Sequence, residues 1–364
     1  MSLFSVFKEK PLRKALEGVP LPAATGLTVA DALQDLRLEK GKLYLKLCLG
    51  YPFAAVESEL SSRIHKAVEG KCDSVELSMQ WQVADTQSLS SHPAVPGVKN
   101  IIAVASGKGG VGKSTTTANL ALALSAAGAK VGVLDADIYG PSQSKMLGVE
   151  GVKPEIIDGK KVMPIEAAGG IQMIGMGNLV DENTPMVWRG PMVSGAFKQL
   201  LSATAWSDID YLLIDMPPGT GDIQLTLSQS VPVSGAVIVT TPQDIALLDA
   251  RKGIEMFRKV NVPILGVVEN MSLHTCSNCG HEDAVFGTSG GERLAKDYDV
   301  EMLGQLPLQA SICEQTDRGE PPVLANPGSP VSKKYADIAA RVAGGLWSQA
   351  LKGATGPSIS ISDD

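Results

Sequence analysis

The chain has 364 residues, which is enough for about two domains of typical size. Hydrophobic residues make up 44% and charged residues 20% of the sequence, an ordinary globular composition that excludes general disorder. The formal net charge of −7 disfavours nucleic acid or an anionic membrane as the main partner, because both require a basic surface.

The N-terminal segment does not have the pattern of a targeting sequence. Residues 1–11 lack a continuous apolar region and a small-residue cleavage site, and Glu9 and Glu17 interrupt the basic pattern of a transit peptide. The sequence also has no run of about 18 apolar residues that would cross a membrane. The five cysteines are too few and too scattered for a disulfide framework. We therefore expect a cytoplasmic protein with reduced thiols.

Residues 1–83 are predicted to form a small α+β domain. Leucine occupies every odd position from Leu43 to Leu49, a period typical of a half-buried strand, and Cys48 falls on the opposite face. A second alternating run and two amphipathic stretches complete one compact unit. The predicted elements are a helix over 11–16, a strand over 43–49, a helix over 54–68 and a strand over 75–79.

A larger domain is predicted over residues 100–352, after a Ser- and Pro-containing linker over 84–99. In it, short and nearly continuous apolar runs alternate with amphipathic helical stretches. This pattern is typical of parallel strands covered on both faces, so we predict an α/β fold with a mostly parallel central sheet flanked by helices. Residues 353–364 are predicted to be a flexible tail. The predicted strands are 101–105, 131–134, 171–174, 211–214, 236–240, 264–268 and 302–306.

A phosphate-binding loop follows the first of these strands. The segment fits G-x-x-x-x-G-K-[ST] between a strand and a helix, a context that disfavours a chance Gly-rich turn. Its glycines allow backbone N–H groups to surround phosphate oxygens, Lys113 supplies charge at the β- and γ-phosphates, and Ser114 offers a hydroxyl to Mg²⁺. The predicted nucleotide-binding residues are Gly107, Lys108, Gly109, Gly110, Val111, Gly112, Lys113, Ser114 and Thr115.

Polar residues end three further strands of the predicted sheet. Asp135 and Asp137 follow the second strand, and Asp215 follows the fourth. A carboxylate at such a strand end holds Mg²⁺ in P-loop proteins, often through water, and Asp215 fits this role. A single Asp there is commonly a cap, but two such ends beside one P-loop favour function. Residues 217–221 are predicted to be a switch loop, and Asn270 follows the sixth strand, where an ordinary turn residue is the alternative.

Cys276 and Cys279 form a C-x-x-C pair that is close enough to bind one metal ion or cluster. Tetrahedral zinc or a [4Fe–4S] cluster needs four ligands, and the chain has no second pair. Two chains related by a twofold axis would bring four thiolates to one bridging cluster. The alternatives are a zinc site completed by His274 and His281, or a redox pair. We expect the remaining cysteines to be packed singly: Cys48, Cys72 and Cys313.

The combination of motifs resembles one family. The early Lys108 in K-G-G-x-G-K-[ST] is similar to the deviant Walker A group, which includes the nitrogenase iron protein, MinD and ParA. Residues 99–351 resemble an iron–sulfur cluster carrier ATPase of the Mrp/ApbC type, and residues 1–83 resemble the SufT/PaaD-type domain often fused ahead of it. The segments that carry the resemblance are 107–114, 135–142, 188–192, 215–222, 241–244 and 269–279.

The resemblance implies a homodimer that hydrolyses ATP, holds a labile [4Fe–4S] cluster between the Cys276 and Cys279 pairs of two chains, and transfers it to apoproteins. It also implies that Lys108 reaches the partner's phosphates, that Asp137 positions or activates the attacking water, and that Asn270 reads the adenine edge. A solvated lysine remains the alternative for Lys108.

Two further points qualify this assignment. After Ser142 the family often has a proline, where this chain has Gln143-Ser144-Lys145. The competing function is a positional switch of the MinD/ParA kind with a structural zinc knuckle, which would need a basic amphipathic terminus or surface. The acidic balance disfavours that function, so neither nucleic acid nor a membrane is an expected partner.

Overall fold

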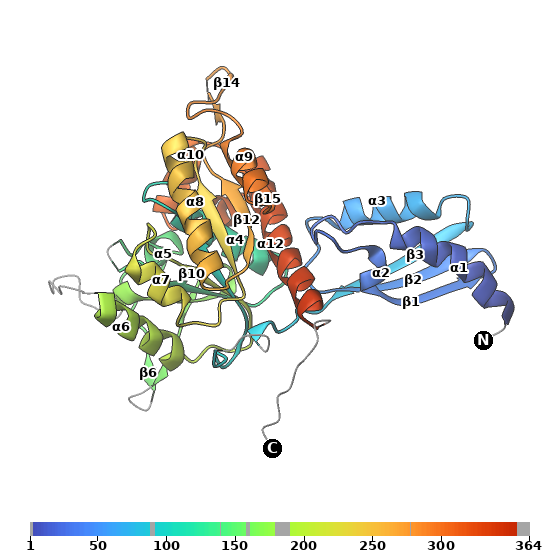
Figure 1. Ribbon diagram of the computed structural model, residues 1–364, viewed down its shortest axis with the longest axis horizontal. Helices are drawn as coiled ribbons and strands as arrows, with labels where there is room; N and C mark the ends of the chain where they lie inside the picture. The colour runs from blue at the N-terminus through green and yellow to red at the C-terminus, as the bar shows by residue number, and fades with distance from the viewer. Residues whose placement is uncertain are drawn as a thin grey trace.

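The computed structural model describes residues 3–87, 92–138, 140–157, 161–178, 190–276 and 278–354. A large domain built on an eight-stranded sheet is joined to a small domain with a three-stranded sheet, which extends to one side next to helix α12 (Pro330–Ala354) (Figure 1). Among the described residues, no helix combines the length and the apolar character needed to cross a membrane.

In the small domain, the helix α1 packs against the strand β1 and against the helix α3. The β1 and β2 strands are antiparallel and β2 and β3 are parallel, in the order β1-β2-β3. The leucines of β2 are buried, and Cys48 on the opposite face is half-buried, as the alternation predicted. The sequence did not reveal β1, because a register shift between Leu33 and Asp35 breaks its alternation. The elements are α1 (Leu3–Glu17), α2 (Val29–Ala32), β1 (Leu33–Glu39), β2 (Lys42–Leu49), α3 (Glu57–Val68) and β3 (Ser74–Trp81).

The large sheet has the order β15-β12-β11-β4-β10-β5-β9-β8, and all of it is parallel except the edge strand β8 (Ile165–Ala167). The predicted α/β fold and its strands are confirmed; β8 is too short to carry a sequence pattern. The strands β5, β10 and β11 are buried at every residue, as their continuous apolar character requires. The parallel strands are β4 (Val98–Ala105), β5 (Val131–Asp135), β9 (Ile171–Gly175), β10 (Ile209–Asp215), β11 (Gly235–Thr240), β12 (Ile264–Glu269) and β15 (Met302–Gln305).

Helices cover both faces of this sheet and bury a separate apolar cluster on each. The helices α4 and α12 pack together on one face, whereas α6, α7, α8 and α9 lie on the other. Short elements connect these layers at the ends of the strands. The helices are α4 (Lys113–Ala126), α5 (Gln143–Met146), α6 (Gly190–Ala203), α7 (Asp222–Ser228), α8 (Asp244–Lys259), α9 (Gly290–Asp297), α10 (Ala310–Asp317) and α11 (Pro322–Ala325), and the short strands are β6 (Ile156–Ile157), β7 (Lys161–Val162), β13 (His274–Thr275) and β14 (Glu282–Asp283).

The described part of the predicted linker is not a free tether. Gln87 is buried, and its side-chain amide bonds the backbone of Val95 and of Val98. The Thr86 hydroxyl donates to Asn100 Oδ1 at 2.7 Å. Strand β4 begins at Val98, inside the predicted 84–99 segment. At the other end, α12 continues to Ala354, so the first two residues of the predicted tail are helical; the rest of that tail lies outside the described residues.

The small domain contacts the large one mainly through α12. The rings of Tyr51 and Trp347 lie with their centroids 5.8 Å apart, and both side chains are buried. A Cβ atom at Gly344 would lie 2.1 Å from the carbonyl oxygen of Ala23, so only glycine permits this approach of the helix to the small domain. The buried cluster on the α4 and α12 face therefore continues into the core of the small domain.

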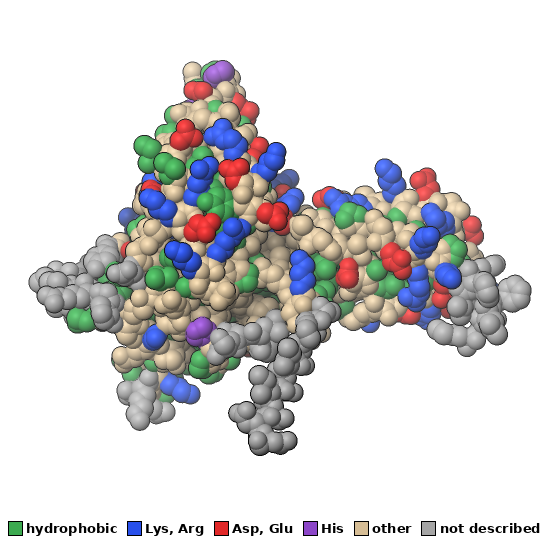
Figure 2. Space-filling view, viewed as in Figure 1, with side chains coloured by type: hydrophobic (Ala, Val, Ile, Leu, Met, Phe, Trp, Pro, Cys, Tyr) green, Lys and Arg blue, Asp and Glu red, His purple; other side chains and the backbone are tan. Residues whose placement is uncertain are grey.

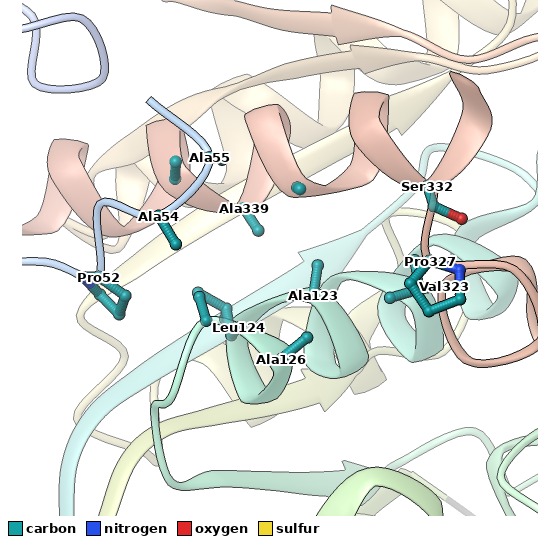
Figure 3. Close-up of a pocket in the computed structure, with 13 residues that line it drawn as sticks. Pro52, Ala54, Ala55, Ala123, Leu124, Ala126, Val323, Pro327, Ser332 and Ala339 are labelled. Atoms are coloured by element: carbon teal, nitrogen blue, oxygen red, sulfur yellow. The ribbon is translucent and has the colours of Figure 1, made fainter. Parts of the chain in front are cut away.

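A cavity of about 140 Å³ remains at this domain contact (Figure 3). Pro52 and Ala54 line it from the loop before α3, Leu124 and Ala126 line it from the last turns of α4, and Ala339 lines it from α12. The helix that follows the P-loop thus contacts the small domain side of the molecule at its C-terminal end.

Replacing Trp347 with Ala is expected to lower the free energy of unfolding by about 3–5 kcal/mol, the usual cost of truncating a large buried aromatic side chain. Because Trp347 packs on Tyr51, the variant should also expose residues 50–56, the loop that carries Tyr51, to protease. Denaturant titration and limited proteolysis measure the two effects. The matched control is Lys333→Ala on the exposed side of the same helix. Parental unfolding and proteolysis of the Trp347 variant would show that the domains do not depend on this contact.

Candidate functional site

The P-loop connects β4 to α4 and has the backbone geometry that its glycines predict. Gly110 and Gly112 adopt φ values of +78° and +81°, in the left-handed region that side chains rarely enter. A Cβ atom at Gly107 would lie 2.2 Å from the backbone of Asp249 on α8. The loop is therefore fixed between the sheet and α8, and its backbone N–H groups lead into the N-terminus of α4, an arrangement suited to phosphate.

Lys113 and Asp215 form a buried ion pair at the base of this loop. The Lys113 ammonium contacts Asp215 Oδ1 and lies 3.2 Å from the hydroxyl of Ser114. Lys113 is 6% exposed and Asp215 is fully buried. The Asp215 carboxylate also accepts hydrogen bonds from the Thr117 hydroxyl at 3.2 Å and from Gln143 Nε2 at 2.9 Å. The predicted phosphate and Mg²⁺ residues thus meet at one point.

Asp135 is a second buried carboxylate beside this pair. Its oxygens accept backbone N–H bonds from Asp137, Ser142 and Gln143 at 2.8–3.0 Å. Burial, and then the neighbouring Asp215 carboxylate, raise the pKa of Asp135 to about 7. Asp135 therefore holds the chain that leaves β5. The next acidic residue, Asp137, is 8% exposed, and its Oδ1 accepts the N–H of Gly140 at 3.3 Å.

Lys108 and Asn270 each make a hydrogen bond that ties the P-loop to a neighbouring connection. The Lys108 ammonium donates to Gln243 Oε1 at 3.3 Å, just ahead of α8. Asn270 follows β12 and donates from Nδ2 to the carbonyl oxygen of Val111 at 2.9 Å. A Cβ atom at Gly112 would lie 2.1 Å from this nitrogen, so the asparagine is pressed against the P-loop.

The predicted switch loop also touches the P-loop. The N–H of Gly219 donates to the carbonyl oxygen of Ser106 at 3.0 Å, and Gly219 has a φ of +98°. Sequence reasoning missed Gln143 and Thr117 as members of the site, because isolated polar residues carry no pattern, although Gln143 stands directly after the 135–142 motif. Gln243 lies inside the 241–244 motif, but its contact with Lys108 was not predicted. Trp188 and Arg189 of the 188–192 motif lie outside the described residues.

The cysteine pair lies on a hairpin that projects beyond the end of the sheet, at β13 and β14 (Figure 1). The N–H of Cys276 donates to the carbonyl oxygen of His281, and the N–H of Gly280 donates to that of Cys276, both at 2.9 Å. Hydrogen bonds from the backbone N–H groups of Cys279 and Asn278, and then from the Cys279 side chain, lower the pKa of the Cys276 thiol. Cys279 is exposed. The hairpin therefore presents the cysteine pair at the surface, and the lowered pKa favours deprotonation of Cys276.

The other candidate ligands do not join this pair into a larger site. In the part of the chain that the structure describes, no three His, Cys, Asp or Glu side chains gather as a metal site, so His274 and His281 do not complete a four-ligand zinc set within the described chain. Cys313 was predicted to be packed, but it is exposed on α10, with Sγ 3.7 Å from Asp317 Oδ2. Its position on the outer face of a short helix explains the error.

Comparison with known proteins gives a family and a fold. Residues 97–343 match the ParA model, described as NUBPL iron-transfer P-loop NTPase. An iron–sulfur cluster carrier protein of Pseudomonas fragi is 60% identical over 275 residues, covering 75% of this chain and 96% of the relative. The iron–sulfur cluster carrier protein of Escherichia coli K12 is 49% identical over 327 residues, covering 89% of this chain and 88% of the relative.

Two solved structures share the fold of the large domain. A nucleotide-binding protein from Archaeoglobus fulgidus, in complex with ADP, superimposes with a TM-score of 0.56 at 37% identity, covering 62% of this chain and 88% of that chain. The cell division ATPase MinD of Pyrococcus furiosus superimposes with a TM-score of 0.52 at 26% identity, covering 67% of this chain and 98% of that chain.

Cys276 is expected to react with iodoacetamide faster than Cys72 or Cys313 near neutral pH. Hydrogen bonds lower the pKa of Cys276, whereas burial and Asp73 raise that of Cys72, and Asp317 raises that of Cys313. Since the thiolate is the nucleophile, the advantage of Cys276 should widen as the pH is lowered. Peptide mass spectrometry of briefly alkylated, metal-free protein measures the order. Equal labelling of the three at mildly acidic pH would contradict it.

Proposed function

The chain belongs to the ParA family of NUBPL-type iron-transfer P-loop NTPases, and from this premise we propose that it is an ATP-dependent carrier that binds an iron–sulfur cluster and transfers it to apoproteins. One observation carries the proposal. Asn270, the first residue after β12, is hydrogen-bonded to the P-loop at Val111. The chain then continues from Asn270 into the hairpin that holds Cys276. The nucleotide loop and the cargo ligands are therefore joined by one short segment of chain.

The nucleotide site fits ATP with Mg²⁺. Phosphate oxygens would draw the Lys113 ammonium away from Asp215, which leaves Oδ1 of that carboxylate with the Thr117 hydroxyl as its described donor and open to a cation. The Asp215 carboxylate and the Ser114 hydroxyl are oxygen ligands of the kind that Mg²⁺ prefers, and both lie beside Lys113. Bound Mg²⁺ would neutralise charge on the β- and γ-phosphates.

Two residues have proposed roles in hydrolysis and in base selection. Asp137 lies next to Asp135 at the end of β5. We assign it the role of a general base, which would orient the attacking water and accept a proton from it. Asn270 is assigned to the adenine edge, and its contact with the P-loop at Val111 supports this role. Turnover is expected to be slow until a client is present.

The proposed cargo is a labile [4Fe–4S] cluster held between two copies of the chain. Each chain supplies Cys276 and Cys279, and such a cluster needs about four thiolates. The lowered pKa of Cys276 favours the thiolate that binds iron. A twofold arrangement of two hairpins supplies the full set.

Exposed apolar side chains support a homodimer through this end of the molecule. Ile245 and Leu248, one turn apart on α8, are 70% and 54% exposed, and Leu273 just ahead of the cysteine pair is 37% exposed. Ile245 stands two positions after Gln243, the partner of Lys108. A second copy packed here would bring Lys108 toward the partner's nucleotide.

The competing positional switch finds less support. On the face shown in Figure 2, basic and acidic side chains are interspersed over both domains, unlike the basic surface that binding to DNA or to anionic lipid requires. We also propose a cytoplasmic location, since reduced, metal-binding cysteines suit a reducing compartment.

The proposed function predicts one [4Fe–4S] cluster per dimer after anaerobic reconstitution. Cys276→Ala or Cys279→Ala should remove the visible absorbance of the cluster and the activation of an apo client, while ATP binding is kept, because the hairpin lies outside the P-loop. Iron, sulfide and zinc analysis gives the stoichiometry.

Cys313→Ala is the matched control for this experiment, because it removes an exposed thiol from another helix and should retain the cluster. Colourless protein with one zinc per chain and no uptake of iron would overturn the carrier function in favour of a structural zinc knuckle.

Lys108→Ala is expected to keep ATP binding and lose hydrolysis. If Lys108 acts across a dimer, mixing this variant with Lys113→Ala chains should restore part of the ATPase rate, because one of the two sites in a mixed dimer regains both lysines. The rate at several mixing ratios is the measurement. A rate that never exceeds that of the separate variants would assign Lys108 to its own chain's site.

A further inference from the structure

Gln143 joins three parts of the nucleotide site through one side chain and its own backbone. Its side chain is fully buried, and the amide nitrogen Nε2 donates to Asp215 Oδ2 and to the carbonyl oxygen of Ser114, both at 2.9 Å. The backbone N–H of the same residue donates to Asp135 Oδ2 at 2.9 Å. The end of β5, the end of β10 and the first turn of α4 therefore meet at this glutamine.

The contact with Asp215 matters most when Lys113 changes partner. In this structure Oδ1 of Asp215 is occupied by Lys113 and Thr117, and Oδ2 by Gln143. Once phosphate draws Lys113 away, Gln143 and Thr117 remain as the described donors on a fully buried carboxylate. A buried charge that loses its ion partner is held in place only by such hydrogen bonds.

The remaining atom of the amide is also placed at the site. Both hydrogen atoms of Nε2 are used by Asp215 and Ser114, which fixes the rotation of the amide. Its oxygen Oε1 is buried and accepts no hydrogen bond from the described residues. An amide oxygen held in this way next to Asp215 and Ser114 is an acceptor for water bound to a cation there.

We propose that Gln143 is a positioning residue of the nucleotide site, which holds the Asp215 carboxylate in the orientation needed for Mg²⁺ after Lys113 has moved to the phosphates. The inference rests on the Mg²⁺-ATP site proposed above and adds a residue to it. Because Gln143 contacts the carboxylate and not the P-loop glycines, it should govern the response to Mg²⁺ and not the affinity for the nucleotide alone.

The test is a titration of Gln143→Met, which keeps the length of the side chain and removes its hydrogen bonds. Binding of a fluorescent, non-hydrolysable ATP analogue is measured in EDTA and then with increasing Mg²⁺. The variant should match the parent in EDTA and require about tenfold more Mg²⁺ for half of the Mg²⁺-dependent gain, the change expected for one lost hydrogen bond to a charged group. ATPase rates should show the same displacement in Mg²⁺.

Gln172→Met is the matched control. Gln172 lies near the amino end of β9, away from the P-loop, and its side-chain amide bonds the backbone of Ser207. It should respond to Mg²⁺ as the parent does. A folded Gln143→Met protein with the parental Mg²⁺ midpoint, or with weakened binding already in EDTA, would overturn the proposal.

If Gln143→Met does not fold, Gln143→Asn takes its place, since it keeps the amide but shortens its reach. Failure of both to fold would overturn the proposal by placing Gln143 in the stability of the domain. If the parent protein itself shows no response to Mg²⁺, the proposed Mg²⁺-ATP site is overturned, and the inference about Gln143 is overturned with it.

Discussion

The buried ion pair between Lys113 and Asp215 is the interaction on which the rest of the site depends. Parallel strands place their carboxyl ends at one edge, so the P-loop after β4 faces the acidic ends of β10 and β5. A lysine and two carboxylates buried together are tolerated only as a set, since each isolated charge would be costly. The raised pKa of Asp135 is one sign of that balance. In the proposed function, phosphate would compete with Asp215 for the ammonium group of Lys113.

The connection after β12 links the P-loop to the hairpin that holds the cysteine pair. Asn270 donates a hydrogen bond to the P-loop at Val111, and the chain then continues over a few residues to the hairpin that presents Cys276 and Cys279. The backbone of Ser272 and its hydroxyl are both bonded to the carbonyl oxygen of Leu306, at 2.9 and 3.0 Å, which anchors the middle of the connection. One continuous segment of backbone therefore runs from Asn270 at the P-loop to the thiols of the hairpin.

The sequence predicted the large domain well because its information is local there. Buried parallel strands are apolar throughout, and the P-loop glycines Gly110 and Gly112 adopt positive φ angles that residues with a side chain rarely adopt. The same reasoning missed features that depend on distant partners. A bulge at Leu33 hides β1, and Gln87 is buried because it bonds the backbone of Val95 and Val98, although its polar segment has a linker's composition. Gln143 was noted only as a departure from a family pattern, since no periodicity marks a buried amide.

The helix α4 connects the P-loop to the contact between the two domains. Its 14 residues form a rod of about 21 Å, with Lys113 at one end and the alanine-lined cavity beside the small domain at the other. The far end borders unfilled space lined by small side chains, whereas the first turn is held by the ion pair of Lys113 with Asp215. The fold thus places one end of a single helix at the P-loop and its other end at the contact with the small domain.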